Sequence, residues 1–193
     1  RIVHIHPDPD ELGHVWRPDV AIVATAPAMI AALARQNAVP NPVRAGWTKA
    51  LRADFEGWIQ PKETPGAAKM EKVIGWLAET LPDEAILTNG AGNFAAFLHR
   101  YYSYRGFPTE LAPTSGSMGY GFPAAISASL EHPGRRVVCV AGDGDIQMTL
   151  NEFSTAMQHG ATPITIVANN GQYGTIRMHQ ERTYPGRVSG TRL

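Results

Sequence analysis

The sequence has very little cysteine and no long apolar run, and both shortages narrow its class. A single cysteine, Cys139, excludes an internal disulfide and favours a reducing compartment, so we expect a cytoplasmic protein. Cys139 stands in a short apolar run and is expected to pack in the core, because a nucleophilic thiol needs exposure and a lowered pKa. No run approaches the roughly 20 apolar residues of a membrane-spanning helix, and the apolar start of the chain is too short for a signal peptide.

An excess of charge of one sign is also missing. The chain carries 17 Lys and Arg residues against 17 Asp and Glu residues. This balance offers no basic surface and no acidic tail, and we expect neither nucleic acid nor a membrane as partner. Internal repeats and low-complexity segments are absent too. The 193 residues are enough for one sizeable core, or for one domain and a piece of another.

Two polar signatures follow two short apolar runs. Gly142-Asp143-Gly144 follows the run 137–141, Asn169-Asn170 follows the run 164–168, and 24 residues separate the signatures. Both runs are rich in β-branched residues and do not alternate, as in buried parallel strands. Between them, residues 146–159 place one apolar stripe on a helix that Gly160 ends, formed by Ile146, Leu150, Phe153 and Met157. A strand–helix–strand unit with parallel strands is therefore expected.

Asp143 and Asn170 would then stand just past the carboxyl ends of two neighbouring strands, about 4.8 Å apart. Open α/β sheets bind their ligands at this edge. Mg²⁺ prefers oxygen ligands, takes few of them from the protein, and completes its shell with phosphates and water. Each signature alone fits an ordinary turn, but the two at this spacing predict a divalent-cation and diphosphate site.

Strands and helices alternate from residue 84 onward, which predicts an α/β fold with a doubly wound parallel sheet. The expected order is strand 84–88, helix 93–101, a loop, helix 119–130, strand 136–141, helix 146–159, strand 163–168 and helix 174–182. Upstream, the patterns predict strands at 3–5 and 20–24, helices at 26–35 and 43–59, a linker at 61–66, and a helix starting near Met70.

The paired signatures resemble the motif of the thiamin diphosphate (ThDP) enzyme superfamily. The stretch from Thr114 to Ala125 is similar to the segment that holds the aminopyrimidine ring there, and Asn170 to Arg177 resembles the decarboxylase and carboligase branch. The resemblance implies a pyrophosphate-binding (PP) domain at 64–193, shortened at its C-terminus. It implies the C-terminal part of a central α/β domain at 1–38 and a helical connection with linker at 39–63. We expect a fragment that has lost its N-terminal part.

The resemblance also implies a set of site residues. Asp143, Asn170 and the backbone carbonyl of Gln172 would bind Mg²⁺, and Met118 would bend the cofactor between its two rings. Asp145 is expected to present only its N–H to the ligand, while its side chain caps the helix from 146. The residues expected to bind the cofactor are Gly92, Asn93, Phe94, Gly116, Ser117, Met118, Asp143, Gly144, Asp145, Asn170, Tyr173, Gly174, Thr175 and Ile176.

The implied parent enzyme decarboxylates 2-oxo acids and forms carbon–carbon bonds, in the manner of acetolactate synthase large subunits. The family's activating glutamate belongs to a pyrimidine-binding (PYR) domain of the partner subunit, so no catalytic residue is assigned here and the fragment alone is expected to be inactive. The resemblance implies a homodimer or tetramer joined through PP and PYR contacts. It does not determine whether the enzyme also binds FAD. The alternatives are a benzoylformate decarboxylase-like enzyme and a non-catalytic phosphate- or nucleotide-binding module. Arg177 could pair a substrate carboxylate or face solvent, and His179 could line the substrate channel.

Overall fold

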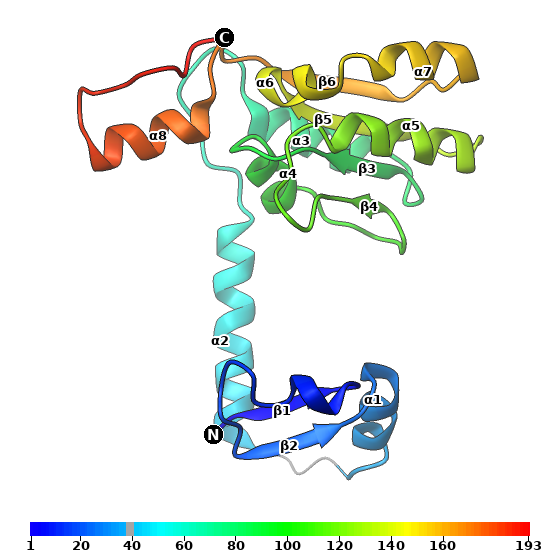
Figure 1. Ribbon diagram of the computed structural model, residues 1–193, viewed down its shortest axis with the longest axis vertical. Helices are drawn as coiled ribbons and strands as arrows, with labels where there is room; N and C mark the ends of the chain where they lie inside the picture. The colour runs from blue at the N-terminus through cyan, green and yellow to red at the C-terminus, as the bar shows by residue number, and fades with distance from the viewer. Residues whose placement is uncertain (38–40) are drawn as a thin grey trace. The chain divides into compact units, whose positions relative to one another are not determined.

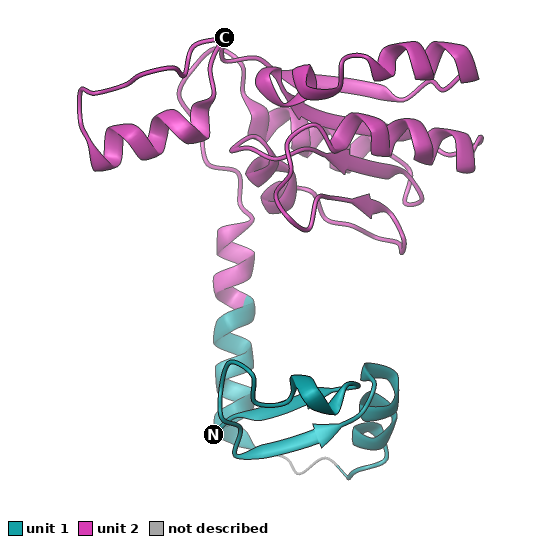
Figure 2. Cartoon of the chain, in the orientation of Figure 1, with its two compact units in different colours: residues 1–52 teal, residues 53–193 magenta. Residues whose placement is uncertain are grey.

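A computed structural model describes residues 1–37 and 41–193 of the chain. The chain divides into two compact units, residues 1–52 and residues 53–193 (Figure 2). The division falls inside helix α2 (Pro42–Trp58). The domain boundary expected between 38 and 39 lies outside the described residues, and the domain limits expected from the sequence stay a prediction.

The first unit contains a small parallel sheet. Its two strands pair in parallel with Val3 opposite Val20. The Thr25 hydroxyl accepts a hydrogen bond from the Ala28 N–H at 3.4 Å and so begins the helix that follows. The elements are β1 (Val3–His6), η1 (Pro9–Glu11), β2 (Val20–Val23), α1 (Ala26–Ala34) and the start of α2. The strands and the helix expected here are confirmed to within one residue.

The second unit is built on a four-stranded sheet whose neighbouring strands are all parallel, in the order β4–β3–β5–β6 (Figure 1). Its elements in chain order are α3 (Met70–Thr80), β3 (Ile86–Asn89), α4 (Ala95–Tyr101), β4 (Glu110–Leu111), α5 (Gly121–Glu131), β5 (Val137–Gly142), α6 (Asp143–Ile146), η2 (Gln147–Thr149), α7 (Glu152–His159), β6 (Ile164–Ala168) and α8 (Gly174–Thr183).

β5 lies inside the sheet, and its successive side chains enter two different cores. Cys139 and Ala141 pack with Phe122 of α5 on one face. Val138 and Val140 pack on the other face with a cluster that includes α3 and α4. This alternation is the period of two of a strand, and here both faces are covered. The expected doubly wound sheet is confirmed.

Cys139 is completely buried in the first of these cores. Burial raises the pKa of its thiol to about 11, which keeps the thiol protonated and unreactive at neutral pH. The expected packing role is confirmed. Among the residues that the structure describes, none of the helices combines the length and apolar character that crossing a bilayer requires.

The single helix expected over 146–159 is wrong. The chain forms α6, the 3-10 turn η2 and then α7, and only Ile146 of the expected stripe is buried. The Thr149 hydroxyl donates to the Gly119 carbonyl at 3.0 Å, which ties η2 to the loop before α5. The loop expected between α4 and α5 also contains β4, which adds a strand beside β3. The other elements of this unit shift by no more than about two residues at their ends.

Candidate functional site

Three loops meet at the carboxyl edge of the sheet, after β3, β5 and β6. The register of the sheet brings this about, because Asn89 of β3 pairs with Val140, while Gly142 pairs with Ala168 of β6. The strands therefore end at nearly the same level, and their following loops share one edge of the sheet (Figure 1). β5 and β6 are direct parallel neighbours, as the spacing of the two signatures predicted.

Asp143 joins the two signatures directly. It is the first residue of α6, and its Oδ2 accepts the N–H groups of Asn170 at 3.1 Å and Gly171 at 2.6 Å. Its Oδ1 accepts the N–H of Gly144 at 3.0 Å. One carboxylate at the end of β5 thus orders the loop that follows β6.

The other two expected metal ligands lie on that same loop. Asn170 Oδ1 accepts the N–H of Gln172 at 3.0 Å, which closes a local turn. The Gln172 side chain turns away and accepts from Arg177 at 2.8 Å. Across the described ranges 1–37 and 41–193, no group of three or more His, Cys, Asp and Glu side chains could hold a metal. One carboxylate with amide and carbonyl oxygens fits a hard cation that takes its other oxygens from phosphate and water.

α8 presents free backbone donors toward this loop. It begins at Gly174 after Tyr173, and no side chain among residues 1–37 and 41–193 caps its first turn. The leading N–H groups of a helix lack partners within the helix, and the positive end of its dipole favours anions. Thr175 Oγ1 accepts the N–H of Asn93 at 3.2 Å, so the loop after β3 is held against the start of α8. Ile176 lies in the same turn and is exposed.

The ring of Phe94 packs against the backbone at Gly92 and Gly142. A Cβ added at Gly142 would lie 2.8 Å from the ring, and one added at Gly92 would lie 2.7 Å from it. Both glycines therefore let the ring pack directly on the backbone of the loop after β3 and of the end of β5. Phe94 also packs against the core cluster on the α3 and α4 face. Its place in the structure links the core to the expected cofactor loops.

Asp145 caps the start of α6 and not a helix from 146, so the expected position of the cap is wrong. It lies in the first turn of α6, only 2% of its surface is exposed, and its carboxylate turns inward. Oδ1 accepts the N–H groups of Gly119 at 2.8 Å and Ala91 at 3.2 Å, and Oδ2 accepts that of Gly142 at 3.4 Å. Burial raises the pKa of Asp145, and the three backbone donors oppose that rise. The side chain therefore holds the loop after β3, the loop before α5 and the end of β5 together.

The loop expected to hold the aminopyrimidine ring precedes α5. Gly116 and Gly119 both have positive φ values, 68° and 79°. Ser117 is exposed and its hydroxyl lies 2.8 Å from that of Ser115, while Met118 is half-buried. Since Gly119 donates to Asp145, this loop and the Gly-Asp-Gly turn have a fixed mutual position. The structure thus brings the two halves of the expected site side by side.

Two glycines that were not predicted as site residues allow the start of α5, the loop after β3 and Asp145 to pack closely together. A Cβ at Gly121 would lie 2.6 Å from the backbone nitrogen of Gly90 and 2.7 Å from the carbonyl carbon of Asn89. A Cβ at Gly90 would overlap the carboxylate of Asp145. The only signal in the sequence was the glycine richness of the two loops, which does not say which glycine makes the close approach.

Gly144 makes its close approach to an aromatic ring. It is among the residues expected to bind the cofactor. A Cβ there would lie 2.7 Å from the ring of Tyr173 and 3.2 Å from Leu193. Tyr173 therefore covers the turn that contains Asp143 and Asp145. Gly174 allows a similar close approach in the loop after β6, since a Cβ there would lie 2.8 Å from the side-chain amide nitrogen of Asn170.

Arg177 and His179 both have partners on or near α8. Arg177 donates to Gln172, and its other terminal nitrogen lies 3.9 Å from Glu181. His179 Nδ1 lies 2.9 Å from a guanidinium nitrogen of Arg182. Arg177 is therefore engaged with the loop after β6 rather than simply extended into solvent.

Residues 90–193 match the family model of the thiamine pyrophosphate enzyme, C-terminal TPP binding domain. The chain is 28% identical over 198 residues to the acetolactate synthase large subunit of Haemophilus influenzae, which covers 99% of the chain and 34% of that protein. It is 30% identical to the acetolactate synthase isozyme 1 large subunit of Escherichia coli, over 98% of the chain and 35% of that protein.

The acetolactate synthase of Mycobacterium leprae is also 30% identical, over 100% of the chain and 32% of that protein. The chain thus spans about a third of the length of the curated relatives it matches. The family match covers more than half of the chain and includes every loop of the site described above. The chain belongs to the family of thiamine pyrophosphate enzymes, and residues 90–193 are its C-terminal TPP binding domain.

Proposed function

We propose that this chain is part of an acetolactate synthase-like enzyme that uses ThDP and Mg²⁺ to decarboxylate a 2-oxo acid and join the remaining acyl unit to a second carbonyl compound. The observation that most supports this proposal is that the Asp143 carboxylate accepts hydrogen bonds from the N–H groups of Asn170 and Gly171, at the edge where α8 begins. Relatives with that printed name align along almost the whole chain, which supports the same activity.

In this proposal Asp143, Asn170 and the carbonyl of Gln172 hold Mg²⁺, and the cation holds the diphosphate. The N–H groups of Gly174, Thr175 and Ile176 donate hydrogen bonds to the diphosphate oxygens. The loop from Gly92 to Phe94, held against the start of α8, also contacts the diphosphate. Tyr173 and Gly144 shape the floor of this cradle. Asp145 holds the neighbouring backbone in place, because its carboxylate is buried and accepts three backbone N–H groups.

The loop of Gly116, Ser117 and Met118 holds the aminopyrimidine end of the cofactor. Met118 is half-buried and its flexible thioether suits the irregular gap between two rings. When bound, ThDP supplies the electron sink that lets the carboxylate of a 2-oxo acid leave as CO₂. These residues contribute orientation and exclusion of water, and the proton that activates the pyrimidine ring is assigned to a glutamate of a PYR domain.

The rest of the enzyme belongs to the same proposal. Residues 1–38 form the end of a central domain, 39–63 a connection, and 64–193 the PP domain. The enzyme is a cytoplasmic homodimer or tetramer joined through PP and PYR contacts. The 193 residues alone are expected to bind the cofactor without turning over pyruvate, since they span about a third of their relatives.

Calorimetric titrations of the chain test the proposal. ThDP and ATP are each titrated with Mg²⁺ and with the cation chelated. The proposal expects saturable ThDP binding that needs Mg²⁺, and much weaker binding of ATP. A chain that prefers ATP, or that binds both ligands equally, would instead be a general phosphate- or nucleotide-binding module.

A further inference from the structure

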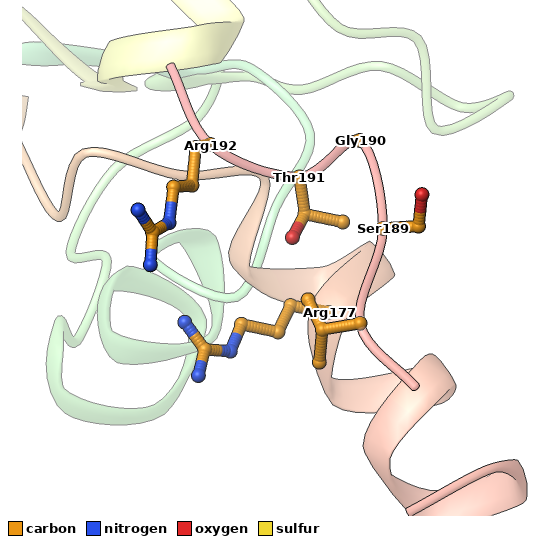
Figure 3. A pocket seen from close by; sticks show the side chains of 6 residues that line it. Arg177, Ser189, Gly190, Thr191 and Arg192 are labelled. Atoms are coloured by element: carbon orange, nitrogen blue, oxygen red, sulfur yellow. The ribbon is translucent and has the colours of Figure 1, made fainter. Parts of the chain in front are cut away.

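We propose that the pocket between α8 and the segment 188–192 binds a small oxyanion, a ligand carrying a phosphate or carboxylate group, at a site separate from the ThDP cradle. The pocket has a volume of about 490 Å³, within the range of small-molecule sites. It is lined by Arg177, Val188, Ser189, Gly190, Thr191 and Arg192 (Figure 3). None of these residues belongs to the set proposed above for ThDP or Mg²⁺.

Two guanidinium groups gather at this pocket. Figure 3 shows the side chains of Arg177 and Arg192 extending to the same side, with their guanidinium groups toward one another. Glu181 lies 3.9 Å from Arg177, at the limit of an ion pair, and no carboxylate of the described residues pairs with Arg192. Two like charges with one distant counter-charge favour an anion between them. Guanidinium groups match the planar, two-point geometry of carboxylate and phosphate oxygens.

Thr191 supplies an independent sign of a ligand. Its side chain is 2% exposed, and its hydroxyl has no hydrogen-bond partner within the part of the chain that the structure describes. A buried hydroxyl without a partner costs free energy, so native structures rarely leave one. Thr191 lines the pocket beside Arg192, and its hydroxyl is covered in the structure. In this proposal the Thr191 side chain turns toward the arginines when an oxyanion binds, and its hydroxyl then donates to that oxyanion.

The segment that carries these donors is fixed on both sides. The side-chain amide of Gln180 donates to the Ser189 carbonyl at 3.0 Å and accepts the Ser189 N–H at 3.1 Å. The Tyr173 N–H donates to the Thr191 carbonyl at 2.9 Å. Gln172 and Arg192 form an antiparallel bridge. Donors that are already ordered lose little conformational entropy when a ligand binds, which favours a built site over a chance gathering of charges.

The experiment titrates the 193-residue chain with inorganic phosphate and with malonate, at constant ionic strength set by chloride. Binding is followed by calorimetry and by amide chemical shifts. We expect one saturable site, and the tighter of the two probes identifies the class of oxyanion. Arg192→Gln should weaken binding at least about tenfold, since it removes a charged donor. Thr191→Val should weaken it severalfold, and both variants are first checked for folding by circular dichroism.

Arg187→Gln is the matched control. Arg187 lies in the same part of the chain, over the ring of Tyr184 at 6.0 Å, and does not line the pocket. An equal loss in Arg187→Gln and Arg192→Gln would overturn the proposal, because binding would then follow net charge. So would the failure of both probes to saturate above the chloride background.

A last arm separates this site from the cofactor site. The phosphate titration is repeated with ThDP and Mg²⁺ in excess, and an unchanged phosphate affinity is expected. Competitive loss of phosphate binding would show that the pocket is part of the diphosphate cradle and would overturn the claim of a separate site. A chain that binds phosphate but not ThDP would refute the proposed function and leave this inference standing.

Discussion

Asp145 is the residue on which the arrangement of the site depends most. Its buried carboxylate accepts backbone N–H groups from the loop after β3, from the loop before α5 and from the last residue of β5. A neutral amide could not replace it, because an Asn side chain has one acceptor oxygen and would turn a donor toward other donors. The cost of burying the charge, seen in its raised pKa, is met by these three hydrogen bonds.

Asp145→Asn should therefore lower the free energy of unfolding by roughly 1–3 kcal/mol. The matched control is Asp83→Asn. Asp83 is exposed and pairs with Arg105 at 2.6 Å, and surface ion pairs of this kind contribute about 1 kcal/mol or less. Urea unfolding of the parent and both variants makes the comparison. Equal stability of Asp145→Asn and the parent would mean that the two loops and the end of β5 hold together without this carboxylate.

Glu71 gives the chain a second buried carboxylate with a different pH response. The Thr64 hydroxyl donates to Glu71 at 2.7 Å and holds the pKa of Glu71 below its ordinary value, against the opposing effect of burial. An acid whose pKa is lower in the folded state stabilises the fold above its unfolded pKa. That stabilisation disappears as the pH falls through the folded pKa.

Glu71→Gln should accordingly lose stability relative to the parent at neutral pH, and the difference should shrink as the pH falls below the ordinary glutamate value of 4.5. Urea midpoints measured from pH 7 down to pH 3 report this trend. Glu79→Gln, at an exposed position of the same helix, should follow the parent throughout. A difference that stays constant across this range would remove ionised Glu71 as the cause.

At the scale of elements, the close packing of α5 on the end of β3 fixes the position of the loop that contains Met118. Gly121 opens α5, and its missing Cβ lets the helix start directly on the backbone of Asn89 and Gly90. Backbone atoms cannot rotate away as a side chain does, so an added methyl group has to move the helix. The loop of Met118 immediately precedes this point and would move with it.

Gly121→Ala should thus destabilise the fold by about 1–3 kcal/mol, the usual cost of overpacking. Gly75→Ala in α3 is the matched control, because a Cβ there meets nothing within 4 Å. That control should gain roughly 0.5–1 kcal/mol, since alanine favours a helix over glycine. Thermal unfolding of the two variants decides the matter. The packing argument is wrong if both variants shift in the same direction by the same amount.

The elements also show how far the sequence could be read. Runs of β-branched residues at 137–141 and 164–168 predicted both strands, because short buried strands leave a local mark. The apolar spacing from Ile146 to Met157 looked like one helix, yet hydrogen bonds to distant loops at Asp145 and Thr149 divide it. β4 has two residues and exists only through its pairing with β3, so no local pattern could have indicated it.

In the site, too, some features could be predicted from a local sequence pattern, and others depend on contacts between distant residues. Asp143 and Asn170 could be brought together from sequence, because parallel strands place their ends at one edge. The inward turn of Asp145, the ring of Tyr173 on Gly144 and the pairing of Gln172 with Arg192 depend on tertiary contacts. Hydrophobic periodicity carries no information on such contacts, which explains why the direction of the Asp145 side chain was predicted wrongly and the other two contacts were not predicted.

At the scale of the whole molecule, one sheet edge collects the segments that follow β3, β5 and β6. The chain spans about a third of its relatives, so its own task in the proposed enzyme is to hold the diphosphate and the cation. The central claim is that Asp143 does this by joining the loops after β5 and β6. Its carboxylate is the single charged ligand of the proposed metal site.

The most direct test is a calorimetric titration of ThDP, with Mg²⁺ present, into the parent chain, Asp143→Ala and the exposed-site control Asp83→Ala. We predict that Asp143→Ala weakens ThDP binding by about 100-fold or more and removes its dependence on Mg²⁺. Asp83→Ala should bind as the parent does, and circular dichroism should show all three chains folded. If Asp143→Ala binds ThDP with Mg²⁺ as tightly as the parent, the site lies elsewhere and the central claim is contradicted.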